Sequence, residues 1–156
     1  MPDLMSHLLI GLILAELFDV RKKSLVALGA IMPDIFSKLD LIYFFLGKMP
    51  IVSFASFHTP LMCFLLSILV ASLFAYSKIK AVFLLSLGSI SHFLADLSIR
   101  HFNEFGTRFL FPFSMKNYTL SLIWPEQSIY VMAFSLIAYL SIIFVKKKIN
   151  VHAGHG

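Results

Sequence analysis

Residues 79–99 read IKAVFLLSLGSISHFLADLSI, an apolar run of helical length that carries one histidine and one aspartate. His92 and Asp96 are four positions apart, so a helix places the imidazole and the carboxylate on one face, one turn from each other. Ionisable groups are costly inside such a run and are candidates for function by default. The stretch therefore predicts a buried helix with a functional site on one face.

The whole chain is much more apolar than a water-soluble domain. Hydrophobic residues make up 59% of its 156 residues and charged residues 13%, against about 45–50% and about 25% in soluble domains. Backbone groups in lipid have to pair within their own segment, so long apolar runs are expected to be helices. The runs cover residues 4–20, 24–46, 60–76, 79–99 and 128–145. Each has about the length needed to cross a hydrocarbon core about 30 Å thick.

The predicted fold is therefore an all-α polytopic membrane bundle of about five transmembrane helices. It forms a single domain over residues 1–156, with a flexible tail at about 149–156. Pro33 interrupts the second run, and because proline removes a backbone donor, that helix is expected to kink or break there. Whether residues 24–46 form one span or two half-helices stays open.

The basic residues predict the orientation of the helices. If five helices alternate in direction, one side carries Arg21, Lys22, Lys23, Lys78, Lys80, Lys146, Lys147 and Lys148. The opposite side carries Lys48, Arg100, Arg108 and Lys116. The positive-inside rule then predicts a multi-pass protein of the cytoplasmic (inner) membrane, with its N-terminus outside and its C-terminus in the cytoplasm.

Five polar residues in or beside the apolar runs form the candidate site: His7, Asp34, His58, His92 and Asp96. The predicted topology brings them from four helices toward the outer leaflet. Three imidazoles and two carboxylates are a ligand set that Zn²⁺ and similar ions prefer. We therefore expect a divalent metal, zinc or alternatively manganese, as one or two ions.

Each residue also has a structural interpretation that the sequence leaves open. His92 and Asp96 can form a hydrogen bond that packs helices together. Asp34 can form an ion pair with Lys38, four residues on. His7 can be an interfacial side chain, and His58 can be a loop residue at a helix start.

A bound divalent metal would lower the pKa of a coordinated water and polarise a phosphoryl or acyl oxygen. His58, His92 and Asp96 are expected to bind the metal, and His7 to hold a second ion or close the site. Asp34 is expected to be either a ligand or the catalytic general base. Two outer-loop arginines are expected to clamp a substrate phosphate, although contact with lipid headgroups would explain them too; they are Arg100 and Arg108. The role of His101 stays open.

Several short motifs together resemble the YdjM-type family of membrane-bound metal-dependent hydrolases. They are Ser6-His7-Leu8 through Gly11, Leu28-Gly29-Ala30 with Pro33-Asp34, Phe57-His58-Thr59, Leu87-Gly88 with Ser91-His92 through Asp96, and Phe105-Gly106 followed by Phe111-Pro112-Phe113-Ser114. The resemblance implies a membrane enzyme that hydrolyses its substrate with a bound metal.

The chain is more distantly similar to zinc-dependent phospholipase C and the related single-strand nucleases. Their pattern has an early His, an Asp, a His and a helix with His-x-x-x-Asp, which the five candidate residues match. The chain departs from that pattern after Asp96, because Ser98 occupies the place of the next ligand histidine. The ligands then suffice for one ion, or for two bridged by Asp96.

The predicted function is a membrane-embedded metal-dependent hydrolase that cleaves a phosphate ester of a lipid or lipid-linked substrate. No stripe of Lys and Arg with interleaved aromatics predicts a nucleic-acid partner. The alternative is a non-enzymatic metal or proton carrier, which predicts polar residues in the inner half as well. A haem protein would leave the two carboxylates unexplained. The oligomeric state stays open.

Overall fold

The computed structural model describes residues 4–47, 57–100 and 108–153, and every regular element in these ranges is helical. This confirms the predicted all-α class. An isolated bridge between Ile99 and Ile123 is the one β-type pairing recorded within these ranges. The helices are α1 (Leu4–Leu17), α2 (Lys23–Ser37), α3 (Leu39–Phe45), α4 (Pro60–Ser72), α5 (Lys78–Ser98) and α6 (Ser128–Ala153), with a 3₁₀ turn η2 (Pro125–Gln127) before α6.

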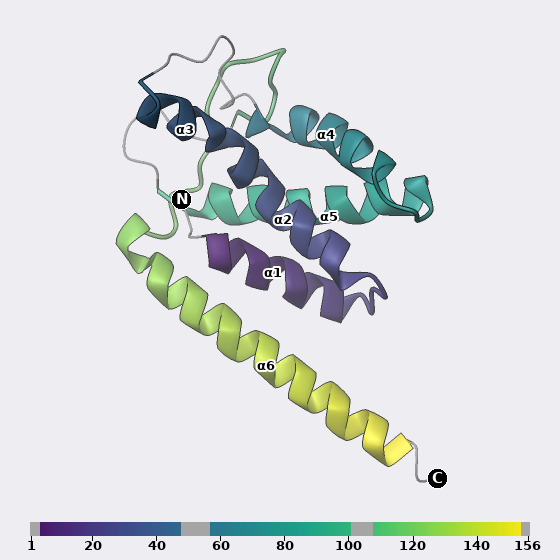
Figure 1. The fold of residues 1–156 in the computed structure, drawn as a ribbon. Helices are drawn as coiled ribbons and strands as arrows, with labels where there is room; N and C mark the ends of the chain where they lie inside the picture. Colours follow the sequence, from purple (N-terminus) through teal and green to yellow (C-terminus); the bar gives the residue numbers. More distant parts are fainter. Residues whose placement is uncertain (1–3, 48–56, 101–107, 154–156) are drawn as a thin grey trace.

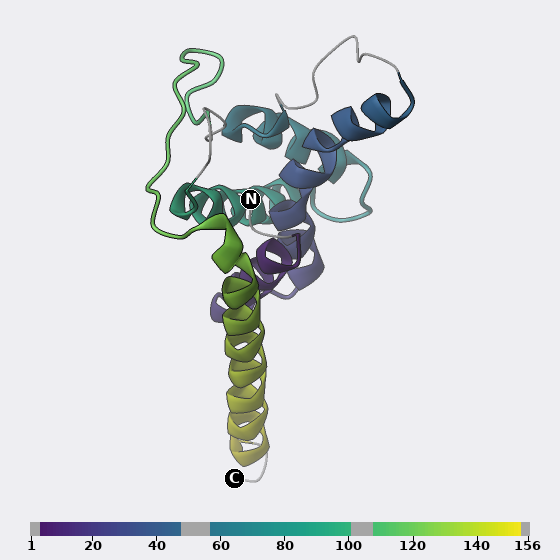
Figure 2. The same ribbon diagram turned by 90° about the vertical axis from the view of Figure 1, so that its left-hand side faces the viewer.

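Helix α5 is the centre of the bundle, because it packs against α1, α2 and α4 (Figure 1). Helices α2 and α5 run in the same direction, and α1 and α4 run opposite to them. Helix α6 packs along α1 and extends well beyond the other helices (Figure 2). It continues past the predicted end at residue 145 to Ala153.

The prediction of five transmembrane helices is supported only in part. Among the described residues, two helical stretches are long and apolar enough to cross a membrane, Lys78–Ser98 and Pro125–Ile149. Helices α1 and α4 are apolar but have 14 and 13 residues, whereas a hydrocarbon core about 30 Å thick needs about 20. The predicted runs 4–20 and 60–76 therefore include apolar residues that lie beyond the helix ends.

The expected break at Pro33 is wrong in position, because α2 continues through Pro33 to Ser37. Proline cannot donate to the carbonyl four residues earlier, which here belongs to Gly29. The Ser89 hydroxyl of α5 donates to that carbonyl at 3.1 Å, so the oxygen keeps a hydrogen bond. The chain instead leaves the helix at Lys38, and α3 begins at Leu39.

Two glycines allow α2 and α5 to approach each other at backbone distance. A Cβ atom on Gly88 would lie 2.1 Å from the carbonyl oxygen of Val26, and one on Gly29 would lie 2.1 Å from that of Leu85. Both contacts are far too short for any larger residue. Small residues at such crossings are typical of helix packing in membranes.

The two ends of this bundle differ in chemistry. At one end, the turn after α1 and the first turn of α5 carry basic residues, and the adjoining core is apolar, built around Ala15, Leu25, Val26, Leu84 and Leu85. We call this the basic end. At the other end, residues 120–123 return along α5, where Leu120 and Leu122 donate to the carbonyls of Leu97 and Ser98. The candidate residues lie at this second end.

Candidate metal centre

All five candidate residues meet in one place, which we call the His/Asp cluster. His7 comes from the first turn of α1, Asp34 from the last turn of α2, and His58 from the residues just before α4; His92 and Asp96 come from α5. Four of the five are completely buried, and the His58 side chain is 15% exposed. The cluster therefore joins three helices and the segment before α4, and its partly exposed member is His58.

The ring nitrogens and carboxylate oxygens of the cluster converge within a few ångströms. The Nε2 atoms of His58 and His92 are 2.9 Å apart. Asp96 Oδ2 lies 3.0 Å from His58 Nε2 and 3.4 Å from His92 Nε2. Asp96 Oδ1 lies 3.4 Å from His7 Nε2, so one carboxylate faces all three imidazoles.

The orientation of His92 is set from behind by α2. Its Nδ1 lies 2.8 Å from the carbonyl oxygen of Ala30. A carbonyl can only accept, so Nδ1 carries the proton and the lone pair of the neutral ring lies on Nε2, which faces the cluster. A backbone carbonyl on the far nitrogen is the usual support of a metal-binding histidine. The contact depends on the close approach of α2 and α5 at Gly29 and Gly88.

The two carboxylate oxygens of Asp34 face different groups. Its Oδ2 forms an ion pair with Lys38 Nζ at 2.9 Å. Its Oδ1 faces the cluster, 3.6 Å from His58 Nε2 and 3.9 Å from His92 Nε2, and no group in the described ranges hydrogen-bonds to it. The Lys38 pair that the sequence offered as an alternative is therefore present, but it leaves the other oxygen directed at the histidines.

His58 and His7 are held in different ways. The Cys63 thiol donates to the Phe57 carbonyl at 2.9 Å, which fixes the backbone beside His58. His7 stacks on His92 with ring centroids 3.8 Å apart. Both ring nitrogens of His7 are buried without a hydrogen-bond partner in the described part of the chain. Such a ring is costly to bury unless something binds it.

The donor set fits a divalent metal ion. Two groups of residues have ligand atoms that all lie within 4.8 Å of one another: His7, His92 and Asp96, and Asp34, His58 and His92. Ligand atoms around a tetrahedral zinc, each ~2.0–2.1 Å from it, are about 3.3 Å apart. The separations of 2.9 to 3.9 Å among His58, His92, Asp34 and Asp96 bracket that value.

The two arginines expected to bind substrate have other partners. The guanidinium of Arg100 lies over the Trp124 ring, 4.2 Å from its centroid. Arg108 donates to Asn117 Oδ1 at 3.4 Å. No contact recorded for residues 57–100 and 108–153 joins either arginine to the His/Asp cluster, so their role in substrate binding stays a prediction. His101 lies outside the described residues.

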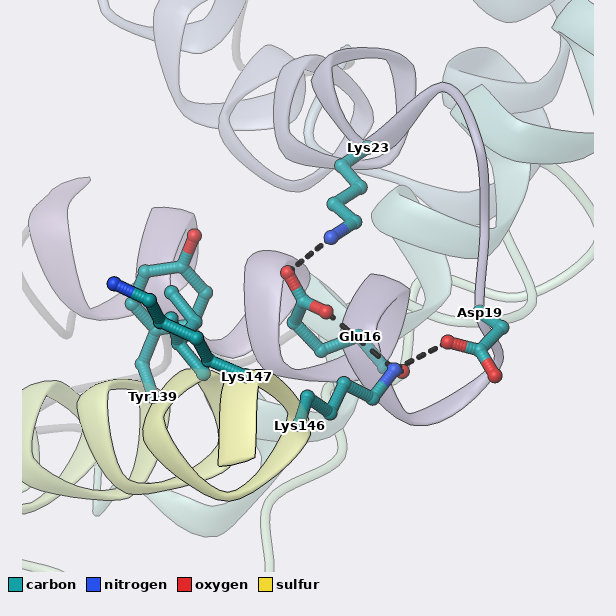
Figure 3. Close-up of a pocket in the computed structure, with 7 residues that line it drawn as sticks. Glu16, Asp19, Lys23, Tyr139, Lys146 and Lys147 are labelled. Atoms are coloured by element: carbon teal, nitrogen blue, oxygen red, sulfur yellow. Dashed lines mark hydrogen bonds and ion pairs between the residues drawn. The ribbon is translucent and has the colours of Figure 1, made fainter. Parts of the chain in front are cut away.

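A second group of charges, which we call the Glu16 network, lies at the basic end. Lys23 donates to the Glu16 carboxylate, and Lys146 of α6 pairs with both Glu16 and Asp19 (Figure 3). Glu16 is 4% exposed. The hydrogen bond from Lys146, and then its charge, hold the pKa of the Asp19 carboxyl below its usual value. The network attaches α6 to the turn after α1 and has no histidine, so it is not a second metal cluster.

Sequence reasoning missed three supports of the site: the Ala30 carbonyl behind His92, the Cys63 thiol beneath His58, and the glycine crossing. The Gly29 and Gly88 pair had a signal, since small residues inside apolar helices mark close approach. The Ala30 carbonyl and His92 are 62 residues apart, whereas the Cys63 thiol donates six residues back along the chain, and no local pattern indicates either contact.

Comparison with known proteins identifies the family. The family model of the YdjM inner membrane protein matches residues 1–154. No curated protein and no solved structure gives a match to the chain. The distant similarity to phospholipase C and the nucleases therefore gains no support.

Proposed function

The chain belongs to the YdjM inner membrane protein family, and we propose that it is a membrane-embedded hydrolase with its metal centre at the His/Asp cluster. The observation that carries this proposal is the convergence of three imidazoles and two carboxylates, from four elements, at a buried point. Fully buried ionisable groups are rarely retained in such surroundings without a function. A divalent cation would balance the two carboxylates and occupy the lone pairs that the described residues leave open.

The residues of the cluster would have different roles in binding the metal and in catalysis. His58, His92 and Asp96 are the closest set and would hold the ion, with His7 completing the shell or holding a second ion through Asp96 Oδ1. When bound, a zinc or manganese ion lowers the pKa of a coordinated water and polarises a phosphoryl or acyl oxygen. Asp34 Oδ1 lies farther from the histidines and is suited to position a water and accept its proton.

Lys38 places a positive charge beside the His/Asp cluster. The Lys38 side chain is 49% exposed and its Nζ lies 2.9 Å from Asp34 Oδ2, while the other oxygen of Asp34 lies 3.6 Å from the partly exposed His58. A phosphate ester that approaches past His58 meets this positive charge. We therefore propose a lipid or lipid-linked phosphate ester as substrate, since an enzyme within the membrane meets its substrate in the bilayer.

The rival function is a metal or proton carrier. A carrier needs polar groups that continue from the cluster toward the opposite end. In the described residues that path is filled by apolar core side chains, among them Leu25, Val26, Leu84 and Leu85. Closure of this path favours a site that holds its ion and acts on one side.

The basic residues suggest how the protein is oriented in the membrane. The basic end is proposed to face the cytoplasm, with the N-terminus outside and the C-terminus inside. The His/Asp cluster then lies toward the outer leaflet, together with the segment that carries Arg108 and Lys116.

The decisive experiment combines metal analysis with hydrolysis assays on the purified full chain. We expect near-stoichiometric zinc or manganese. His92→Ala should weaken metal binding by more than the about 10–100-fold that loss of a supporting contact costs, and a chelator should abolish hydrolysis. Glu16→Gln is the control, because it changes an equally buried carboxylate outside the cluster and should keep the metal. Equal metal in both variants would refute the centre.

The substrate arm uses phosphodiester, phosphomonoester and acyl-ester lipids in mixed micelles. Hydrolysis of a phosphate ester alone supports the proposal as stated. If metal-loaded protein hydrolyses none of the three, the carrier function becomes the better explanation.

A further inference from the structure

A cleft at the basic end is separate from the metal centre and from the Glu16 network. It has a volume of about 410 Å³ and lies between the turn after α1 and the start of α5. Its apolar lining includes Tyr76, Ile79, Phe83 and Leu84. Ile79 is 84% exposed and Phe83 is 65% exposed. The protein therefore leaves an open apolar surface beside this cleft.

The remaining lining is strongly basic. Arg21, Lys22 and Lys80 line the same cleft, and none of them forms an ion pair with a carboxylate in the described parts of the chain. The nearby acids Glu16 and Asp19 are already paired with Lys23 and Lys146. Lys22 Nζ lies 6.0 Å from the centre of the Tyr76 ring. The cleft thus has three positive charges without a negative partner.

Two helix starts add to this positive potential. Helix α2 begins at Lys23 and α5 begins at Lys78, so both N-termini adjoin the cleft. Neither helix has an acidic residue in its first turn, and neither has a side-chain hydrogen bond from its N-cap residue. The first backbone N–H groups of a helix are unpaired and carry partial positive charge. Both helices therefore present donors where an anion is favoured.

We propose that this cleft binds one anionic phospholipid from the leaflet that faces the basic end. The headgroup phosphate would lie among Arg21, Lys22 and Lys80, and an acyl chain would cover Phe83 and Ile79. Basic pockets between helices on the cytoplasmic side of membrane proteins are suited to anionic headgroups. A water-soluble phosphate would satisfy the charges but leave the apolar wall uncovered, so the combination favours a lipid.

This lipid is not the substrate of the proposed hydrolase. The cleft lies at the end opposite to the His/Asp cluster, and its lining has no histidine, cysteine or carboxylate that could hold the proposed metal. Its expected effect is to fix the depth and tilt of the bundle through α2 and α5, the two helices whose crossing supports His92. The proposal holds whether or not the metal centre hydrolyses anything.

The test is native mass spectrometry of the full chain in detergent, titrated with phosphatidylglycerol or with phosphatidylcholine. Wild-type protein should retain one phosphatidylglycerol in preference to phosphatidylcholine. Arg21→Gln/Lys80→Gln should weaken that binding by about tenfold or more, since each interfacial cation contributes to anionic lipid binding. Both residues are exposed, so the variant is expected to fold.

The matched control is Lys147→Gln/Lys148→Gln, which removes two charges from the same end without touching the lining of this cleft. It should bind phosphatidylglycerol as wild type does. Phe83→Ser should weaken lipid binding without changing the charge. Equal loss in both double variants, or no loss in either, overturns the proposal. Displacement of the lipid by an equal concentration of glycerol phosphate also overturns it, in favour of a soluble phosphate ligand.

Discussion

The two ends of the bundle both bury a carboxylate, yet only one groups its carboxylates with three imidazoles. At the basic end, Glu16 is 4% exposed and is paired with two lysines. At the other end, Asp34 and Asp96 are 0% exposed and share one lysine and three imidazoles. Burial of a single carboxylate therefore does not by itself distinguish the His/Asp cluster from the Glu16 network.

The balance of charge is the better marker. In the Glu16 network two carboxylates meet two ammonium groups, and the network is complete with the chain's own residues. Among the ion pairs of the described residues, the His/Asp cluster has one ammonium group, Lys38 on Asp34, and three imidazoles, and both ring nitrogens of His7 lie without a hydrogen bond in the same ranges. The His/Asp cluster could therefore hold a cation, whereas the carboxylates of the Glu16 network are already paired with lysines.

The largest expected difference between the ends is their side of the membrane. A reporter that is active only outside the cytoplasm should be silent when fused after residue 153, beside the basic end. The same reporter fused after Lys116, in the segment that follows α5, should be active. Reversed activities would invert the topology and move the His/Asp cluster to the inner leaflet.

The next largest effect separates the two carboxylates of the cluster. Asp96 Oδ2 lies 3.0 Å from His58 Nε2, whereas Asp34 Oδ1 lies 3.6 Å away. Asp96→Asn should therefore lose metal and turnover together. Asp34→Asn should keep most of the metal and lose about 10²–10⁴-fold in kcat, which is the usual contribution of a general base.

Metal content and kcat measured on the same preparations decide this. If Asp34→Asn loses as much metal as Asp96→Asn, Asp34 is a ligand rather than the base. If it keeps full metal and full turnover, Asp34 has no part in the site. Lys38→Met serves as the companion variant, because it removes the Oδ2 partner and should raise KM for a phosphate ester more than it lowers kcat.

The glycine crossing links the stability of the bundle to the metal centre. A Cβ atom at Gly88 would meet the Val26 carbonyl at 2.1 Å, whereas one at Gly11 would meet the Ala30 side chain at 2.7 Å. Backbone cannot move aside as a side chain can, so Gly88→Ala should cost about 1–3 kcal/mol or more. It should also weaken metal binding, because α2 carries the Ala30 carbonyl that orients His92.

Thermal unfolding and metal titration of both variants test this link. Gly11→Ala is the control and should lower Tm less. A Gly88→Ala protein with wild-type Tm and metal affinity would show that the crossing does not support the site.

The members of the cluster were predictable because each interrupts an apolar run, where an ionisable group is costly. The alternation of helices then brought His7, Asp34, His58 and His92 to one end. The sequence could not show that Ser89 and His92 bond to the Gly29 and Ala30 carbonyls. Those contacts from α5 explain why the helix passes Pro33, and why the break was expected too early.

Helix length was overestimated for a different reason. The apolar run 4–20 continues through Phe18 and Val20, but the helix ends at Leu17 and Asp19 takes a positive φ of 49°. Aspartate tolerates this left-handed conformation better than most residues. A helix length estimated from the apolar run alone therefore includes Phe18 and Val20, which lie in the turn after the helix.

The smallest predicted effect concerns Asp19 at the basic end. The hydrogen bond and the charge of Lys146 lower the pKa of Asp19 in the folded protein below 3.8. The pair therefore stabilises the fold fully at pH values above 3.8, and this contribution is lost as the pH falls through the lowered value. Because the Asp19 side chain is 87% exposed, water and salt screen the pair, and the shift in Tm should be small.

The measurement is Tm of the purified full chain between about pH 3 and pH 6, in wild type and Asp19→Asn. Wild type should be slightly more stable at the upper end, and the two curves should converge as the pH falls. Glu126→Gln is the control, since Glu126 is exposed and forms no ion pair in the described ranges. Parallel curves for wild type and Asp19→Asn would mean that the ion pair between Asp19 and Lys146 does not stabilise the fold. Lys146 would then hold α6 through Glu16 alone.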